Sequence, residues 1–173
     1  MRPDHALRML RSLRDGAPTA LLVPVAAAEP YVDQAAEGMP AHVTVIYPFV
    51  GSRRVVPALV DELGEVLGRH RAFDFALSAI GRFPGVAYLA PEPAAPFVAL
   101  VEACVARWPD HPPFAGAFSE TVPHVTIRPG DLDAEEERRI EAALPLAARA
   151  ECVWLMAPVG GRWTRRATIP LGA

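Results

Sequence analysis

The chain of 173 residues contains no lysine, so all 17 of its basic residues are arginine. This absence excludes several classes of enzyme, because Schiff-base catalysis, lysine adenylation and the P-loop of nucleotide triphosphatases each require a lysine ammonium group. With 20 acidic residues, the formal net charge is −3. This negative charge argues against a protein that binds nucleic acid over its whole surface, because such proteins are strongly basic.

Cysteine is also scarce. Cys104 and Cys152 stand far apart and outside any CxxC spacing, so we expect two reduced thiols and no disulfide framework. No apolar run is long enough to cross a bilayer, and the run at 19–28 is interrupted by Pro24. The first 14 residues contain five charged side chains, which argues against a signal peptide. We therefore expect a cytoplasmic monomer without membrane attachment or an obligate protein partner.

One tetrapeptide occurs twice, once in each half of the chain. HVTV begins at His42, and HVTI begins at His124. The alternation of polar and apolar residues predicts a strand, in which residues i and i+2 point to the same face. His42 and Thr44 therefore share one face of their strand, as do His124 and Thr126. If the two strands lie side by side, two imidazoles and two hydroxyls meet on one surface.

Hydrophobic periodicity predicts the same order of elements around both motifs: a histidine strand, a helix and two strands. The expected strands are 19–25, 41–47, 73–80, 86–90, 121–128, 150–156 and 162–171, and the expected helices are 29–37, 55–70, 96–108 and 133–144.

This repetition predicts a single α+β domain over residues 1–173, with an N-terminal extension at 1–18. We expect a bilobal fold with lobes at about 19–90 and 91–173, related by a pseudo-twofold axis. Each lobe would hold a small antiparallel or mixed sheet with flanking helices, strands would be exchanged between the lobes, and a groove would lie at the centre. Apolar residues make up 51% of the chain, which is sufficient for such a core.

Two imidazoles and two hydroxyls suit acid–base chemistry on a phosphate. One imidazole can take a proton from water or a hydroxyl while the other protonates the leaving oxygen, because histidine titrates near neutrality. Threonine hydroxyls can donate hydrogen bonds to the phosphate oxygens as charge develops there. A single histidine of this kind is more often a buried structural residue, but its repetition in both halves favours a shared site.

Other residues near the motifs admit two interpretations each. Arg128 continues the face of Thr126, so it either binds a phosphate oxygen or forms a surface salt bridge. Tyr47 and Phe49 follow the first motif and either stack on a base in the substrate groove or end a packed strand. Trp163 near the C-terminus either forms a wall of the substrate groove or packs in the core.

The paired motifs resemble those of the 2H phosphoesterase superfamily, and within it the LigT-like or 2′-5′ RNA ligase-like proteins. The flanks PAHVTVIYPF at 40–49 and VPHVTI at 122–127 carry the likeness. The segments GRFPG at 81–85 and IPLG at 169–172 are also similar to the family. The resemblance covers roughly residues 19–172.

The resemblance implies metal-independent, cofactor-free hydrolysis or transfer at 2′,3′-cyclic phosphates or 2′-5′ phosphodiesters, with an RNA end or a nucleotide as the binding partner. It implies that His42 and His124 are the acid–base pair and that Thr44 and Thr126 hold the phosphate. It also assigns the activation of water to His124 and the protonation of the leaving oxygen to His42.

Two other functions remain open at this stage. The same fold can act as a non-catalytic module that binds a nucleotide or an RNA end. A metal hydrolase would use the two motif histidines with a carboxylate such as Asp33 or Glu120, although no metal-ligand spacing supports it.

Overall fold

A computed structural model describes residues 15–33, 37–117 and 120–173. The protein is α+β, with helices and strands interspersed along the chain. In chain order the elements are β1 (Ala20–Pro24), η1 (Ala26–Tyr31), β2 (His42–Ile46), η3 (Ser52–Arg54), α2 (Pro57–Leu67), β3 (Phe73–Phe83), β4 (Val86–Glu92), α3 (Ala95–Arg107), η4 (Pro113–Gly116), β5 (Val125–Pro129), α4 (Ala134–Glu141), β6 (Leu146–Ala150), β7 (Cys152–Val159) and β8 (Arg162–Pro170).

All these strands belong to one sheet. Its eight strands lie in the order β6-β3-β4-β5-β2-β1-β7-β8, and every neighbouring pair is antiparallel. The sequence had predicted two small sheets, so this part of the prediction is wrong. The two motif strands, β2 and β5, are direct neighbours in the middle of the sheet, which is the arrangement that a shared site requires.

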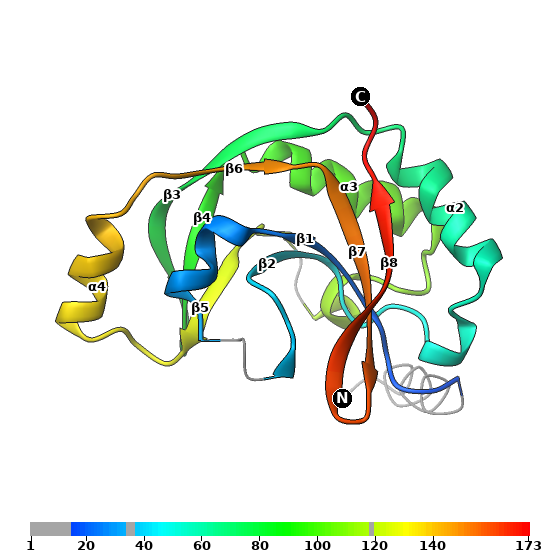
Figure 1. The fold of residues 1–173 in the computed structure, drawn as a ribbon, viewed down its shortest axis with the longest axis horizontal. Coiled ribbons are helices and arrows are strands. Elements are labelled where there is room, and N and C mark those ends of the chain that lie inside the picture. Colours follow the sequence, from blue (N-terminus) through cyan, green and yellow to red (C-terminus); the bar gives the residue numbers. More distant parts are fainter. Residues whose placement is uncertain (1–14, 34–36, 118–119) are drawn as a thin grey trace.

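The sheet curls, and one continuous segment of chain joins its two ends. β6 and β7 are separated by Glu151 alone, yet β6 pairs with β3 at one edge and β7 pairs with β1 near the other. In Figure 1 this orange segment crosses the top of the molecule from the β3 side to the β8 side. The prediction placed a single strand at 150–156 and did not foresee β6.

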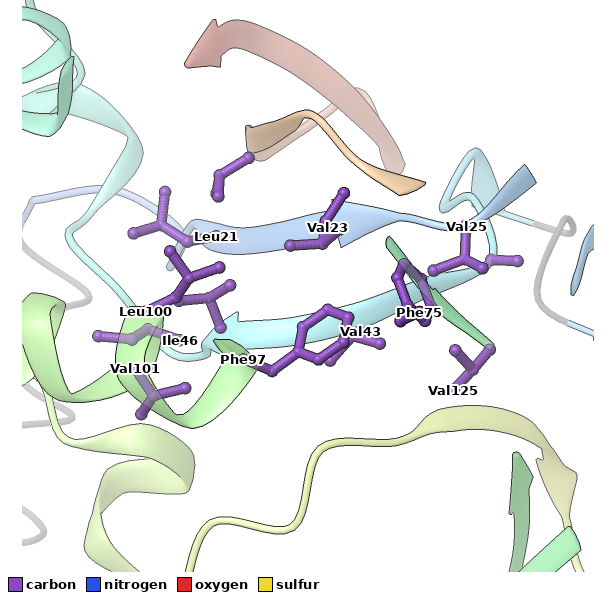
Figure 2. Packing of buried hydrophobic residues seen from close by; sticks show 14 of the residues in the cluster. Leu21, Val23, Val25, Val43, Ile46, Phe75, Phe97, Leu100, Val101 and Val125 are labelled. Atoms are coloured by element: carbon purple, nitrogen blue, oxygen red, sulfur yellow. The ribbon is translucent and has the colours of Figure 1, made fainter. Parts of the chain in front are cut away.

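The main hydrophobic core lies between one face of the sheet and helices α2 and α3. The apolar residues of both motifs point into it, so Val43, Val45, Val125 and Ile127 are all buried. Figure 2 shows Val43 beside Phe97 of α3. Burial of each such side chain contributes about 1.5–3 kcal/mol, so the alternation in the motifs orients the polar residues to the opposite face.

A second, smaller cluster lies on that opposite face. It consists of Ala20, Leu22 and Met156, with Trp154 and Trp163 partly buried against it. Leu22 is the register partner of Thr44 on one side and of Trp154 on the other. The polar residues of the motifs therefore share their face of the sheet with an apolar cluster on β1, β7 and β8.

Several predicted features lie beyond what the structure describes or tests. Residues 1–14 of the N-terminal extension lie outside the described residues. The lobes at 19–90 and 91–173 and their pseudo-twofold axis remain predictions. Within the described part of the chain, no helix is long and apolar enough to cross a membrane.

Candidate active site

The register of the two central strands places the four motif residues together. Val43 of β2 pairs with Val125 of β5 in an antiparallel ladder. In that register His42 lies opposite Thr126, and Thr44 lies opposite His124. Directly opposed side chains have Cβ atoms about 4.5–5.5 Å apart, and diagonal ones about 7–8 Å. Each histidine thus has a threonine beside it and the other histidine diagonally across, on a surface that we call the histidine face.

Both imidazoles are held by the same kind of hydrogen bond. Nδ1 of His42 lies 2.7 Å from the carbonyl oxygen of Pro40, and Nδ1 of His124 lies 2.8 Å from that of Val122. A carbonyl oxygen only accepts, so Nδ1 carries the proton and donates it in both rings. Nε2 is therefore the nitrogen of each ring that is left to gain or lose a proton.

The two histidines differ in electrostatic environment. Burial lowers the pKa of His42 below its ordinary value, and the charge of His124 lowers it further. The hydrogen bond to Pro40 and the carboxylate of Glu29 oppose this shift without reversing it. Burial therefore favours the neutral form of the His42 imidazole, and the charge of the nearby His124 acts in the same direction.

Glu29 is a residue that the sequence interpretation missed. Its carboxylate accepts a hydrogen bond of 2.9 Å from the backbone N–H of Ala41, immediately before His42. Glu29 lies in the short helix η1, whereas the sequence predicted a helix over 29–37. The contact joins residues that are 12 positions apart, so no local sequence pattern predicts it.

Two aromatic rings contact His124 from the neighbouring hairpin. The ring centroid of Phe83 lies 5.1 Å from that of His124, and the centroid of Tyr88 lies 5.4 Å away, both edge to face. Phe83 and Tyr88 stack on each other at 4.3 Å. Tyr88 pairs with Thr126 in the ladder between β4 and β5, and a methyl group at Gly81 would overlap its ring. The sequence interpretation assigned neither ring to the site, although Phe83 lies in the segment GRFPG that resembles the family, because the contact depends on cross-strand register.

Arg128 forms a salt bridge, which is one of the two roles that the sequence suggested for it. Its Nη1 lies 2.9 Å and 3.1 Å from the carboxylate oxygens of Glu136 in α4. The pair is partly exposed, with side-chain exposures of 39% and 33%. This ion pair holds the guanidinium toward α4, so the structure gives no support to the interpretation of Arg128 as a phosphate ligand.

The three aromatic candidates take different positions. Phe49 is only 2% exposed and packs edge to face on Trp108 and His111, so its interpretation as a base-stacking residue of the substrate groove is wrong. Tyr47 is 38% exposed, and its ring lies 6.0 Å from that of Trp163, centroid to centroid. Trp163 belongs to the apolar cluster on the histidine face.

Two cavities lie away from the paired histidines. One of about 480 Å³ is lined by α2 and the end of α3, including Arg107 and Trp108. Another of about 140 Å³ lies between η1, β5 and α4. Among the described residues, no group of three or more histidine, cysteine, aspartate or glutamate side chains is placed to hold a metal ion. Neither Asp33 nor Glu120 therefore joins the two histidines in such a group.

Comparison with solved structures shows a shared fold. E. coli LigT, solved in complex with NADP+, is 16% identical and superimposes with a TM-score of 0.55, over 90% of this chain and 98% of that one. LigT in complex with 3′-AMP gives 15% identity and a TM-score of 0.53, with the same coverage. TT0787 of Thermus thermophilus gives 19% identity and a TM-score of 0.57, over 88% of this chain and 97% of that one.

Sequence comparison identifies the family. Among curated proteins, none matches the chain significantly. The model of the 2′-5′ RNA ligase superfamily matches residues 6–162, which is most of the chain and includes both motifs. The curled antiparallel sheet and the likeness to LigT agree with this match. The chain therefore belongs to the 2′-5′ RNA ligase superfamily, and its fold is like that of LigT.

Proposed function

We propose that the protein is a metal-independent phosphoesterase that acts on a 2′,3′-cyclic phosphate or a 2′-5′ phosphodiester of an RNA end or nucleotide. The observation that carries the proposal is the matched pair of histidines on β2 and β5. Each has its Nδ1–H bound to a backbone carbonyl, and each has a threonine opposite it in the register of Val43 and Val125. Both Nε2 atoms are thereby available on one surface.

The reaction that this pair supports needs one base and one acid. A neutral imidazole takes a proton through Nε2 from the attacking water while the water oxygen bonds to phosphorus. The bond from phosphorus to the leaving ribose oxygen breaks, and the second imidazole, initially charged, gives its Nε2 proton to that oxygen. The net change is one water consumed and one proton moved from each donor to its acceptor, so the histidines exchange protonation states during turnover.

The lowered pKa of His42 favours His42 as the base in the resting enzyme. This assignment is the reverse of the one that family resemblance implies, in which His124 activates water. Burial keeps His42 neutral and ready to accept a proton, whereas His124 then serves as the charged donor. The roles exchange when the reaction runs in the opposite direction.

Thr44 and Thr126 are proposed to stabilise the transition state. The register of β2 and β5, in which each threonine lies opposite a histidine, supports this role. Donation to the non-bridging oxygens is worth most where charge develops, and the loss of one such donor commonly costs 10²–10³-fold in kcat, roughly. The nucleotide complexes of LigT support a nucleotide or RNA end as the substrate class for this chain.

A pseudo-twofold axis between the histidines would account for their matched hydrogen bonds. Four strands lie on each side of the boundary between β2 and β5. On one side these are β2, β1, β7 and β8, and on the other β5, β4, β3 and β6. Each half of the sheet thus contains strands from both halves of the sequence. This order supports two structural halves that have exchanged strands.

The test is turnover of a panel of 2′,3′-cyclic mononucleotides, RNA ending in a cyclic phosphate, and 2′-5′ oligoadenylates. Replacement of His42 or His124 with alanine should each lower kcat by roughly 10²–10⁴-fold, because one proton transfer is lost. Activity should persist in EDTA. His70→Ala is the matched control, since His70 follows α2 and lies outside both motifs.

Wild-type turnover in either motif variant would contradict the proposed acid–base pair. Binding of a nucleotide without turnover of any substrate in the panel would instead identify a binding module of the same fold. Loss of activity in EDTA together with a bound metal ion would indicate a metal hydrolase.

A further inference from the structure

Beyond the four motif residues, the histidine face continues onto β7 and β8. Leu22 of β1 pairs with Thr44 and with Trp154, and Met156 of β7 pairs with Arg165 of β8. Since register partners share a face, Trp154 and Arg165 lie on the same side of the sheet as the reacting centre. Trp163 lies two residues before Arg165 and belongs to the same apolar cluster. We call Trp154, Trp163 and Arg165 the ribbon.

The ribbon has the geometry of a nucleic-acid contact. The guanidinium carbon of Arg165 lies over the Trp154 ring, 4.4 Å from its centroid. This cation–π contact holds the charged group beside the ring. Beside it, the rings of Tyr47 and Trp163 meet edge to face. Tyr47 is 38% exposed, so it presents aromatic surface to solvent next to the fixed guanidinium.

The charge of this region differs from that of the whole chain. From residue 152 to the C-terminus the sequence contains three arginines and no acidic residue, although the net charge of the protein is −3. None of the ion pairs found within the described residues uses Arg162, Arg165 or Arg166. The turn between β7 and β8 projects beyond the rest of the sheet in Figure 1, at the bottom of the view.

The position of the ribbon relates it to the reacting phosphate. Trp154 is two strands away from Thr44, across β1. Adjacent strands are about 4.8 Å apart, so this separation is about 10 Å along the sheet. A nucleotide next to the reacting one can cover that distance, whereas a phosphate held between the histidines cannot.

We infer that the ribbon binds the single-stranded RNA that leads to the reacting phosphate, which makes the substrate an oligonucleotide end and not a free mononucleotide. The inference rests on the proposed function for the identity of the reacting group. Arg165 contacts a backbone phosphate, and the Tyr47–Trp163 pair stacks on a base. Aromatic rings interleaved with arginine are the means by which proteins bind single strands without reading their sequence.

The first arm of the test measures binding alone. A labelled oligoadenylate of about eight nucleotides with a 3′-hydroxyl, a length within the range that one domain covers, is titrated by fluorescence anisotropy at several salt concentrations. Arg165→Gln should raise Kd by roughly five- to tenfold and reduce the slope of log Kd against log salt by about 0.7, because one phosphate contact is lost. Trp163→Leu should raise Kd by roughly fivefold to a hundredfold through lost stacking.

The matched control is Arg162→Gln. It removes the same charge from the same strand, but Arg162 pairs with Val159 and points to the other face by alternation. Its Kd should change less than about twofold at physiological salt, where screening acts over about 8 Å. Thermal unfolding of each variant checks that the fold is kept.

The second arm compares kcat/KM for a mononucleotide 2′,3′-cyclic phosphate with that for an oligoadenylate carrying the same cyclic end. Arg165→Gln should lower the value for the oligonucleotide by the factor seen in binding and leave the mononucleotide value unchanged within about twofold. An unchanged Kd and salt slope in Arg165→Gln would overturn the inference, and so would equal losses on both substrates.

The two proposals fail separately. If neither substrate is turned over but binding still depends on Arg165, the proposed function falls and the RNA-binding ribbon stands. If both substrates are turned over and the ribbon variants behave as wild type, the function stands and the ribbon does not.

Discussion

The two motif histidines make the same hydrogen bond to the backbone, but different side chains surround them. Both rings donate Nδ1–H to the carbonyl two residues before them, which follows from the way each motif enters its strand. His42 is half-buried and lies near the carboxylate of Glu29, whereas His124 is bordered by Phe83 and Tyr88. The repeat in sequence thus produces the same orientation twice, and the neighbours then make the two rings chemically different.

The lowered pKa of His42 predicts the shape of the pH–rate profile. If His42 is the base, kcat/KM should stay high as pH falls below about 6.5, the ordinary histidine value, and decline only through the lower pKa of His42. The measurement is kcat/KM against pH on a cyclic mononucleotide. An acid limb at or above about 6.5 would mean that His42 is not the base.

Protein stability provides a control for this shift that does not depend on activity. The unfolded chain takes up a proton on His42 near pH 6.5, whereas the folded protein does so only at lower pH. The contribution of His42 to the free energy of unfolding is therefore fully present above about 6.5 and is lost as pH falls toward the lowered pKa. His42→Asn should remove this part of the pH dependence, which urea unfolding at a series of pH values measures.

At the residue scale, sequence alternation located the motif side chains but not their neighbours. Alternation within HVT placed His42 and His124 on a face opposite the valines, and the burial of those valines agrees with it. The contact between Tyr88 and His124 could not be predicted, because it depends on the pairing of two strands that are distant in sequence.

Among the elements, the hairpin of β3 and β4 has the most direct influence on the candidate site. It carries Phe83 and Tyr88, which stack on each other and contact His124. Gly81 stands opposite Tyr88 in the ladder and leaves room for its ring, since a side chain there would overlap it. The hairpin therefore borders His124 with two stacked rings, one of which depends on the space above Gly81.

Gly81→Ala tests this arrangement. The added methyl group should displace Tyr88 and with it the support of His124, which should lower kcat by roughly tenfold and destabilise the fold by about 1–3 kcal/mol. In a Tyr88→Ala background the same change should cost little, because the overlapping ring is gone. Measurement of kcat and of the free energy of unfolding for the four proteins gives the coupling.

Gly64→Ala provides the control for this cycle. Gly64 lies within α2, and no atom lies within 4 Å of the place where its methyl group would be. The change should stabilise the helix by about 0.5–1 kcal/mol without affecting kcat. Additive effects of the changes at Gly81 and Tyr88 would contradict the proposed contact.

Element prediction succeeded where periodicity was strong and failed where composition misled it. The predicted helix at 133–144 begins as expected, with Asp133 as its N-cap in a capping box with Glu136. β6 was missed because its sequence, LAARA, is rich in alanine and has no strand-like alternation of large apolar residues. It is a strand because its backbone completes the edge of the sheet beside β3, which is a tertiary requirement.

For the molecule as a whole, the core on the helical face joins segments from both halves of the chain. Phe49 shows this well, since it leaves the end of β2 and packs on Trp108 and His111 beyond α3. Its position explains why it serves stability and not substrate binding. The α+β class was predictable from the order of expected helices and strands, whereas the single curled sheet depends on pairings that no local pattern encodes.

Phe49→Ala should therefore reduce the free energy of unfolding and leave substrate affinity unchanged. Removal of a buried phenylalanine costs about 3–5 kcal/mol through lost burial and the cavity left behind. Urea unfolding measures the loss, and KM on a cyclic mononucleotide should stay within about twofold of wild type under conditions where the variant is folded. A raised KM with unchanged stability would instead assign Phe49 to the substrate surface.

The break at Glu151 between β6 and β7 has a consequence for how the chain can be divided. Because one segment supplies edge pairing to β3 and to β1, a fragment cut between the motifs would lack partners for strands on both sides of the catalytic centre. Two separately produced fragments should be inactive alone and regain activity only on mixing. The duplicated tetrapeptide therefore does not mark two modules that could exist independently, and tandem copies of either half would not reproduce the pairing of β2 with β5.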